Sequence, residues 1–90
     1  MTGRREKIQV IYDILKVVQD KGNEAKPTHI LYRSNLSHHM MQEYLKELIS
    51  REMIEEKTVK KGKIYSLKPK GYEFLEKYRV VVEFMELFDL

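Results

Sequence analysis

Residues 27–67 read PTHILYRSNLSHHMMQEYLKELISREMIEEKTVKKGKIYSL, and this stretch decides the fold. Pro27 suits the first turn of a helix, where its missing N–H is not needed, and Thr28 is a good cap, so a short helix is predicted over 28–33. Ser34, Asn35 and Leu36 then break the helical pattern. The break is three residues long, which is typical of the turn between two helices that pack at an angle.

Ser37 is expected to cap a further helix that runs to about residue 51. Apolar side chains recur there at the spacing of one helix face, and the set comprises Met40, Met41, Tyr44, Leu45 and Leu48. The pattern changes after Ile54, where two short runs with strand-forming residues flank Lys60-Lys61-Gly62-Lys63. A glycine-containing turn between such runs predicts a β-hairpin. The stretch therefore predicts a helix-turn-helix followed by a wing.

Helical spacing also extends to both sides of this stretch. Residues 5–21 are predicted to form a first helix, which Gly22 and Asn23 end because both tolerate the left-handed conformation. Its apolar stripe is Ile8, Ile11, Leu15 and Val18, widened by Val10 and Ile14. Pro69 fits the start of a final long helix, so the fold class is mainly α with a small hairpin, in the order α-α-α-β-β-α.

The final helix carries more apolar surface than one small domain can cover. Five of its residues are spaced 4, 3, 4 and 3 apart, which is a heptad seam, and further apolar side chains broaden it. A second copy of the chain is the simplest burial partner. The sequence thus predicts a winged helix-turn-helix unit over 1–70 and a dimerisation helix over 71–90, with a homodimer interface of Phe74, Tyr78, Val81, Val82, Met85 and Phe88.

Charge is distributed unevenly along the 90 residues, although the net charge is only +3. Fifteen Lys and Arg against nine Asp and Glu precede residue 73, a balance of +6, whereas residues 73–90 hold two against five, a balance of −3. A basic surface attracts polyanions, above all nucleic acid. The chain has no cysteine, its first residues do not resemble a signal peptide, and its longest aliphatic run is Val80–Val82. A cytoplasmic protein with no membrane partner is expected.

Two stretches resemble known proteins. Tyr65-Ser66-Leu67-Lys68-Pro69-Lys70-Gly71 resembles the Tyr-x-Leu-Thr-x-Lys-Gly segment that joins wing and last helix in many prokaryotic winged-helix regulators. Tyr32-Arg33-Ser34-Asn35-Leu36-Ser37, with Tyr44-Leu45-Lys46 downstream, resembles the archaeal winged helix-turn-helix family typified by the Sulfolobus ten-kilodalton chromatin protein. The resemblance implies a nucleoid-associated DNA-binding protein, dimeric through an antiparallel coiled coil. Lys68 departs from the pattern, since a hydroxyl cap is expected there.

The residues expected to contact duplex DNA come from the second helix of the helix-turn-helix and from the wing. The helix would enter the major groove with its outward side chains, and the wing lysines would neutralise phosphates. Six lysines and no acid lie between Lys57 and Lys70. The predicted contacts are Arg33, Ser37, His38, His39, Gln42, Lys46, Lys57, Lys60, Lys61 and Lys63, with Lys26 and an N-terminal arm of Arg4, Arg5 and Lys7 as further candidates.

Three interpretations remain open: a sequence-specific regulator, an abundant chromatin component, and a winged-helix module that binds another protein. Glu43 and Glu47 share the outward helix face with Gln42 and Lys46, and no Arg does, so weak base-specific readout is expected. His38 and His39 are adjacent, so they point about 100° apart on a helix and are poorly placed to share a metal. No catalytic constellation, phosphate-binding glycine loop or small-molecule site is evident, and neither an enzyme nor a cofactor is expected.

Overall fold

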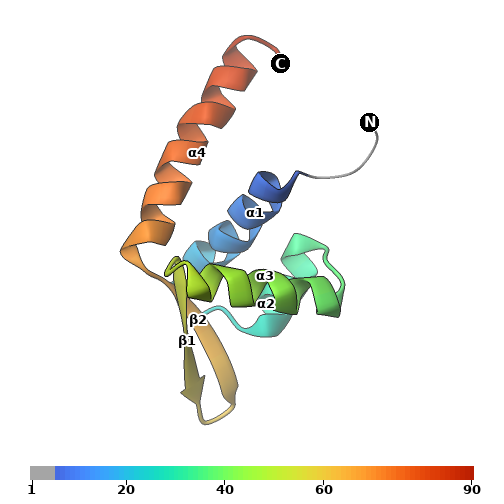
Figure 1. Cartoon of the computed structure of the whole chain (residues 1–90), viewed down its shortest axis with the longest axis vertical. Helices are drawn as coiled ribbons and strands as arrows, with labels where there is room; N and C mark the ends of the chain where they lie inside the picture. The colour runs from blue at the N-terminus through green and yellow to red at the C-terminus, as the bar shows by residue number, and fades with distance from the viewer. Residues whose placement is uncertain (1–5) are drawn as a thin grey trace.

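A computed structural model describes residues 6–90 and arranges four helices above a two-stranded hairpin (Figure 1). The helices are α1 (Lys7–Asp20), α2 (Pro27–Ser34), α3 (His38–Ser50) and α4 (Pro69–Leu87), and the strands are β1 (Ile54–Val59) and β2 (Gly62–Leu67). This order confirms the predicted fold class. Arg4 and Arg5, which were expected to form an arm, lie outside the described residues.

The core forms where the apolar stripes of α1, α2 and α3 meet the base of the hairpin. Ile14, Leu15, Ile30 and Leu48 are fully buried, and Leu45 is nearly so. For two residues the prediction that they face the core is wrong, because Ile8 is 47% exposed and Met40 is 46% exposed. Both lie in the first turn of their helix, and the first buried residues are Val10 in α1 and Met41 in α3.

Local capping explains where the helices begin. Ser37 caps α3 as predicted, since its Oγ accepts the backbone N–H of Met40 at 3.1 Å. The start of α2 differs from the prediction by one residue, because Pro27 is already helical and Lys26 occupies the capping position in place of Thr28. His29 Nδ1 accepts the Lys26 backbone N–H at 3.1 Å, which satisfies a donor that the helix itself cannot.

The hairpin is buried at its base and exposed at its tip. Ile54 pairs with Leu67 in the antiparallel register, and both are buried, whereas Val59 pairs with Gly62 beside the solvent-exposed turn. Gly62 has φ of 128°, a conformation that favours glycine, which explains its place in the turn. The base is extended by Ala25, which exchanges backbone hydrogen bonds of 3.1 and 2.8 Å with Tyr65.

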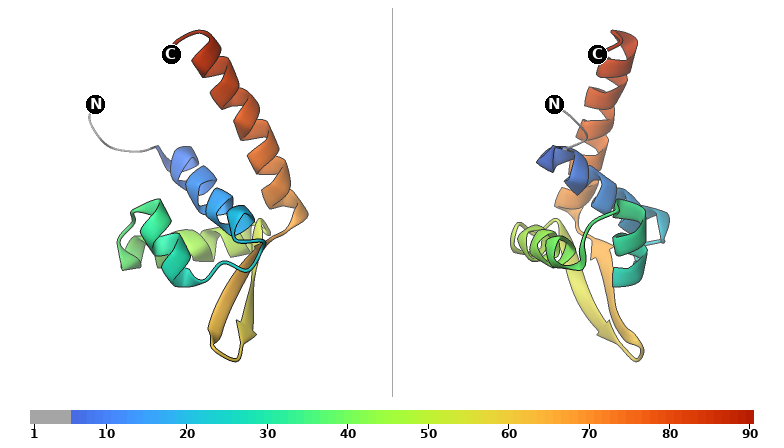
Figure 2. Two further views of the ribbon diagram at one scale, coloured as in Figure 1. Left: turned by 180° about the vertical axis from the view of Figure 1, so that it is seen from behind. Right: turned by 90° about the vertical axis from the view of Figure 1, so that its right-hand side faces the viewer.

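Helix α4 begins at the base of the hairpin and extends away from it, so that the wing and the end of α4 mark opposite ends of the molecule (Figures 1 and 2). Leu75 is buried in the core, and Phe74 and Tyr78 are half-buried. The Tyr78 ring lies 4.8 Å from that of Tyr12 on α1. The first part of the predicted seam therefore already packs partly within its own chain.

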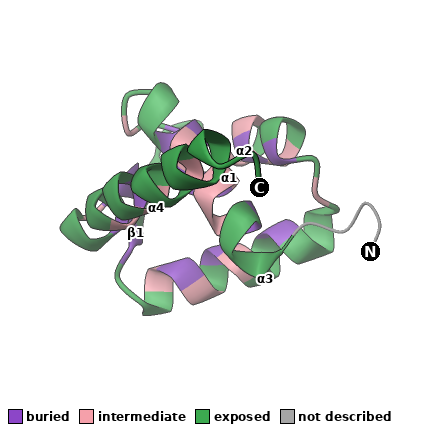
Figure 3. Ribbon diagram, turned by 90° about the horizontal axis from the view of Figure 1, so that it is seen from above, coloured by how far each residue is buried: buried purple, intermediate pink, exposed green. Residues whose placement is uncertain are grey.

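Beyond Tyr78 most of α4 is exposed (Figure 3). Val82 is half-buried, whereas large apolar side chains lie open to solvent at Val80, Val81, Phe84, Met85, Leu87 and Phe88. Isolated exposed apolar residues are common, but a continuous set on one helix marks an interaction surface. None of the helices within residues 6–90 combines the length and the hydrophobicity that crossing a membrane requires.

Candidate nucleic-acid interface

The outward face of α3 carries the side chains predicted to contact DNA. His38, His39, Gln42 and Lys46 are all exposed, and within residues 6–90 none of them forms an ion pair. Ser37 is exposed as well, but its oxygen is already occupied by the capping hydrogen bond at the start of the helix. The face is thus polar, accessible and held in place by the buried side of the same helix.

Glu47 on this face is neutralised by two cations. Lys7 Nζ lies 2.9 Å from Glu47 Oε2, and Arg51 Nε donates to the same oxygen at 3.0 Å. The hydrogen bond from Lys7, followed by that from Arg51, lowers the pKa of the Glu47 carboxyl despite an opposing effect of burial. The sequence analysis took Glu47 as one reason to expect weak base-specific readout, but in the structure Lys7 and Arg51 balance its negative charge. Lys7 also belongs to this network rather than to a free arm.

The lysines of the wing divide into two groups. Lys57 lies 3.9 Å from Glu55, and Lys63 lies 3.5 Å from Glu56, so strand β1 supplies an acid to each of these cations. Lys60 and Lys61 occupy the turn between the strands, are exposed, and form no ion pair with any described residue. The uncompensated positive charge of the hairpin is therefore concentrated at its tip.

Glu56 has a second partner that fixes the geometry of the hairpin. The Tyr65 hydroxyl donates to Glu56 Oε2 at 2.8 Å across the two strands. Burial, together with the neighbouring Glu56 carboxylate, raises the pKa of Tyr65, so this hydroxyl keeps its proton and remains a donor. The acids Glu55 and Glu56 lie just before the lysine-rich stretch, which is why a count beginning at Lys57 did not include them.

Arg33, a predicted backbone contact, is engaged within the chain. Its Nη2 donates to Asp20 Oδ2 at 3.0 Å, which ties the end of α2 to the end of α1. This hydrogen bond is the main reason that the pKa of Asp20 is lowered, and Lys16 at 3.4 Å adds to the effect. Arg33 thus has a structural partner that competes with any phosphate.

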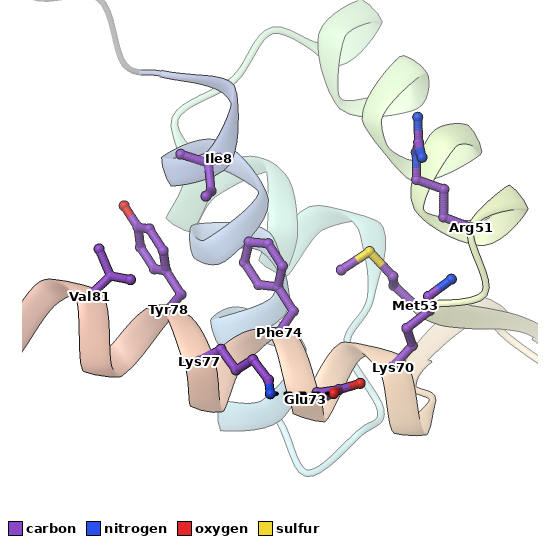
Figure 4. Close-up of a pocket in the computed structure, with 9 residues that line it drawn as sticks. All are labelled: Ile8, Arg51, Met53, Lys70, Glu73, Phe74, Lys77, Tyr78 and Val81. Carbon is purple, nitrogen blue, oxygen red and sulfur yellow. Dashed lines mark ion pairs between the residues drawn. The ribbon is translucent and has the colours of Figure 1, made fainter.

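A groove of about 440 Å³ lies beside α3 rather than on its outward face (Figure 4). It opens between the start of α1, the end of α3 and the part of α4 from Lys70 to Val81. Its floor is apolar and its rim carries three cations and one acid; the lining residues are Ile8, Arg51, Met53, Lys70, Glu73, Phe74, Lys77, Tyr78 and Val81. Sequence reasoning did not predict it, because it forms between three elements that are distant in the chain.

Histidines and carboxylates do not gather into a metal site in the part of the chain that the structure describes. His29 uses its Nδ1 lone pair as an acceptor from Lys26, and partial burial followed by the charges of Lys21 and Lys26 lowers its pKa. Both observations favour the neutral ring.

Comparison with known proteins gives consistent matches over most of the chain. The family model described as winged helix-turn-helix matches residues 4–86. Sso10a-2, a DNA-binding protein from Sulfolobus solfataricus, superimposes with a TM-score of 0.81 at 21% identity, over 93% of this chain and 85% of that one. AF1382 from Archaeoglobus fulgidus gives a TM-score of 0.77 at 19% identity, over 90% and 91%. At these identities the likeness concerns the fold.

One relative has a higher sequence identity to this chain than the two structures above. The uncharacterized protein MJ0290 of Methanocaldococcus jannaschii is 38% identical over 78 residues, which are 87% of this chain. The match covers 34% of that protein, so the chain spans about a third of the length of this curated relative.

Proposed function

This chain belongs to the winged helix-turn-helix family, and on that premise we propose that it binds duplex DNA as a homodimer, with α3 in the major groove and the wing tip on phosphates. The family and its fold are those of DNA-binding regulators rather than of enzymes. The observation that carries the proposal is that the chain has both an exposed polar face on α3 and two exposed lysines, Lys60 and Lys61, at the tip of the hairpin. Neither lysine forms an ion pair with a described residue.

The dimensions of α3 support this arrangement. A helix with its side chains is about 10 to 12 Å across, and the major groove of B-DNA is about 12 Å wide. Gln42 has the donor and acceptor that recognise adenine, and Lys46 can reach guanine or a phosphate. His38 and His39 lie in the first turn of α3, where backbone N–H groups favour a phosphate.

The exposed apolar side chains of α4 support the homodimer. They cover the helix from Val80 to Phe88, at the end of the molecule opposite to the wing, so pairing through α4 leaves both reading faces free. A two-fold dimer would then present two copies of α3 to half-sites separated by about 34 Å, or a multiple of it. The proposal includes association with the nucleoid, either as a regulator at discrete sites or as a chromatin component.

Fluorescence anisotropy with a labelled random-sequence duplex of about 25 base pairs, long enough for two half-sites one turn apart, tests the proposal. Binding is expected at about 50 mM salt and should weaken steeply toward about 200 mM, because phosphate contacts release counterions. Footprinting then separates a discrete palindrome from continuous coverage. If the wild-type chain ignores duplex DNA at low salt, the exposed face of α4 favours the alternative, a module that binds another protein.

Glu47→Gln is expected to strengthen duplex binding. The substitution removes one negative charge from the α3 face and releases Lys7 and Arg51, which are both held by Glu47. Each cation that gains a phosphate contact steepens the salt dependence by about 0.9 and, at about 0.1 M salt, tightens binding up to roughly eightfold. Anisotropy titrations at several salt concentrations measure both quantities.

Glu43→Gln is the matched control, since Glu43 lies on the same exposed face and forms no ion pair within the described residues. It removes the same charge without releasing a cation, so a smaller gain is expected. Equal effects of the two substitutions would show that the network around Glu47 has no influence on binding.

A further inference from the structure

We propose that the groove between α1, α3 and α4 is a binding site for a single-chain amphiphile with a terminal carboxylate, and that this ligand competes with dimerisation through α4. The competition rests on the homodimer proposed above, whereas the binding site itself does not. The groove has a volume of about 440 Å³. Small-molecule sites usually measure about 300 to 1,000 Å³ and are mostly apolar with a few polar groups.

The floor of the groove consists of apolar side chains that the fold leaves uncovered. Ile8 on α1 and Val81 on α4 are each 47% exposed, and Phe74 on α4 is half-buried. Because these side chains come from two helices, they line a hollow rather than the ridge of a single helix (Figure 4). A ligand that lies along the floor removes this apolar surface from water, which favours binding.

Charge and apolar surface are separated along the groove. Lys70 and Arg51 lie at one end, beside Met53, whereas Ile8 and Val81 lie at the other (Figure 4). Lys70 and Val81 are eleven residues apart on one continuous helix, which corresponds to about 16 Å. A ligand that contacts both ends is therefore elongated, anionic at one end and apolar at the other. A fatty carboxylate has this shape and charge.

The charges on the rim favour an occupant with a single negative charge. Arg51 already donates through Nε to Glu47. Lys77 lies 3.6 Å from Glu73. Lys70 forms no ion pair with any residue in the described part of the chain. One uncompensated cation at the end of an apolar groove matches one carboxylate.

The site overlaps the surface through which the chain is proposed to dimerise. Tyr78 and Val81 line the groove and also belong to the predicted dimer interface, whereas Ile8 and Lys70 do not. An acyl chain over the floor thus covers side chains that the partner helix would contact. At ten times its dissociation constant, a ligand that binds only the monomer raises the dimer dissociation constant about 100-fold, since each dimer that separates exposes two sites. Duplex binding should weaken as the dimer is lost.

Isothermal titration calorimetry with octanoate and decanoate, below the concentrations at which they form micelles, tests the site. Each methylene that enters the groove tightens binding about fourfold, so decanoate should bind up to about 15-fold more tightly than octanoate. Decyltrimethylammonium has the same length of chain and the opposite charge. It should bind about tenfold more weakly than decanoate, because attraction by Lys70 becomes repulsion.

Two substitutions outside the predicted dimer interface probe the two ends of the groove. Lys70→Gln removes the uncompensated cation and should weaken decanoate binding about fivefold. Ile8→Gln places a polar group in the floor and should weaken it about tenfold. Lys21→Gln is the matched control, since it removes the same charge directly after α1 and outside the groove, and it should bind decanoate like the wild type. Circular dichroism shows whether each variant is folded.

Sedimentation velocity with and without decanoate tests the competition. Decanoate should shift the wild-type chain toward the monomer. The Ile8→Gln variant retains every residue of the predicted interface but binds decanoate weakly, so it should stay dimeric at ligand concentrations that dissociate the wild type. Anisotropy titrations with the duplex should show the same difference between the two proteins.

The outcomes separate the binding site from the proposed function. The site is overturned if decanoate does not bind, if it binds no better than octanoate, or if Lys70→Gln and Ile8→Gln leave its affinity unchanged; the DNA-binding homodimer then still stands. Decanoate that binds without dissociating the dimer overturns the competition alone. A wild-type chain that is monomeric at micromolar concentration without any ligand overturns the homodimer and the competition, while calorimetry still decides on the site.

Discussion

Replacing both lysines of the wing tip, Lys60→Glu with Lys61→Glu, is expected to weaken duplex binding on the order of 10³-fold at about 0.1 M salt. A dimer would lose four phosphate contacts, and the counterion release of each is worth roughly a factor of eight at this salt. The salt dependence should become shallower by about 3.6, at about 0.9 for each contact. The fold should be unaffected, since both side chains are exposed and form no ion pair with a described residue.

Anisotropy titrations over a range of salt concentrations measure both effects, and circular dichroism reports on the fold. The control is Lys16→Glu with Lys21→Glu, which makes the same change of charge at the end of α1 and directly after it, away from the wing. Because Lys16 also pairs with Asp20, circular dichroism must show that this variant is folded. If the control weakens binding as much as the wing variant, the effect is one of net charge, and the wing tip is not a specific contact. A wing variant that binds like the wild type contradicts the proposed role of the hairpin.

Gly71→Ala is expected to destabilise the fold by roughly 2 to 3 kcal/mol, although glycine to alanine in a helix normally stabilises by about 1 kcal/mol. The reason is a close approach, because a Cβ at position 71 would lie 2.3 Å from the backbone oxygen of Met53. That oxygen already accepts the Lys68 N–H at 3.0 Å, so it cannot move without losing a hydrogen bond. Helix α4 would have to shift away from the core.

Urea unfolding at one fixed protein concentration measures the change, because the proposed dimerisation would make apparent stability depend on concentration. Lys70→Ala in the same helical turn is the control, since Lys70 is exposed, and it should alter the free energy of unfolding by less than about 0.5 kcal/mol. A Gly71→Ala midpoint equal to or above that of the wild type would show that α4 does not pack closely against Met53.

The fold could be predicted from local signals. Helical and alternating patterns fixed the element order, Ser37 marked the start of α3, and Gly62 marked the turn of the hairpin. The prediction failed at Ile8 and Met40, which follow the apolar spacing of their helices but lie in a part of the helix that no neighbouring element covers. Periodicity indicates which face of a helix is apolar, but it does not indicate where along the helix the neighbouring element ends.

The candidate site was predicted as a set of residue types, and the structure adds which of their charges are already engaged. The pair of Lys7 and Glu47 joins residues forty positions apart, so no local spacing could have indicated it. Arg33 and Asp20 likewise meet only because α1 and α2 end side by side. The part of the site that sequence can identify is therefore the local one, the lysine-rich turn and the face of α3.

In the hairpin, the residues that stabilise the fold and the residues proposed to contact DNA lie at opposite ends. Its base, with Ile54, Tyr65 and Leu67, belongs to the core, whereas its tip contacts nothing that holds the fold together. Substitutions at residues 60 and 61 are therefore expected to change the affinity for duplex DNA over orders of magnitude while the melting temperature stays constant. In a library randomised at these two codons, almost all members should fold, and they should differ in their affinity for duplex DNA.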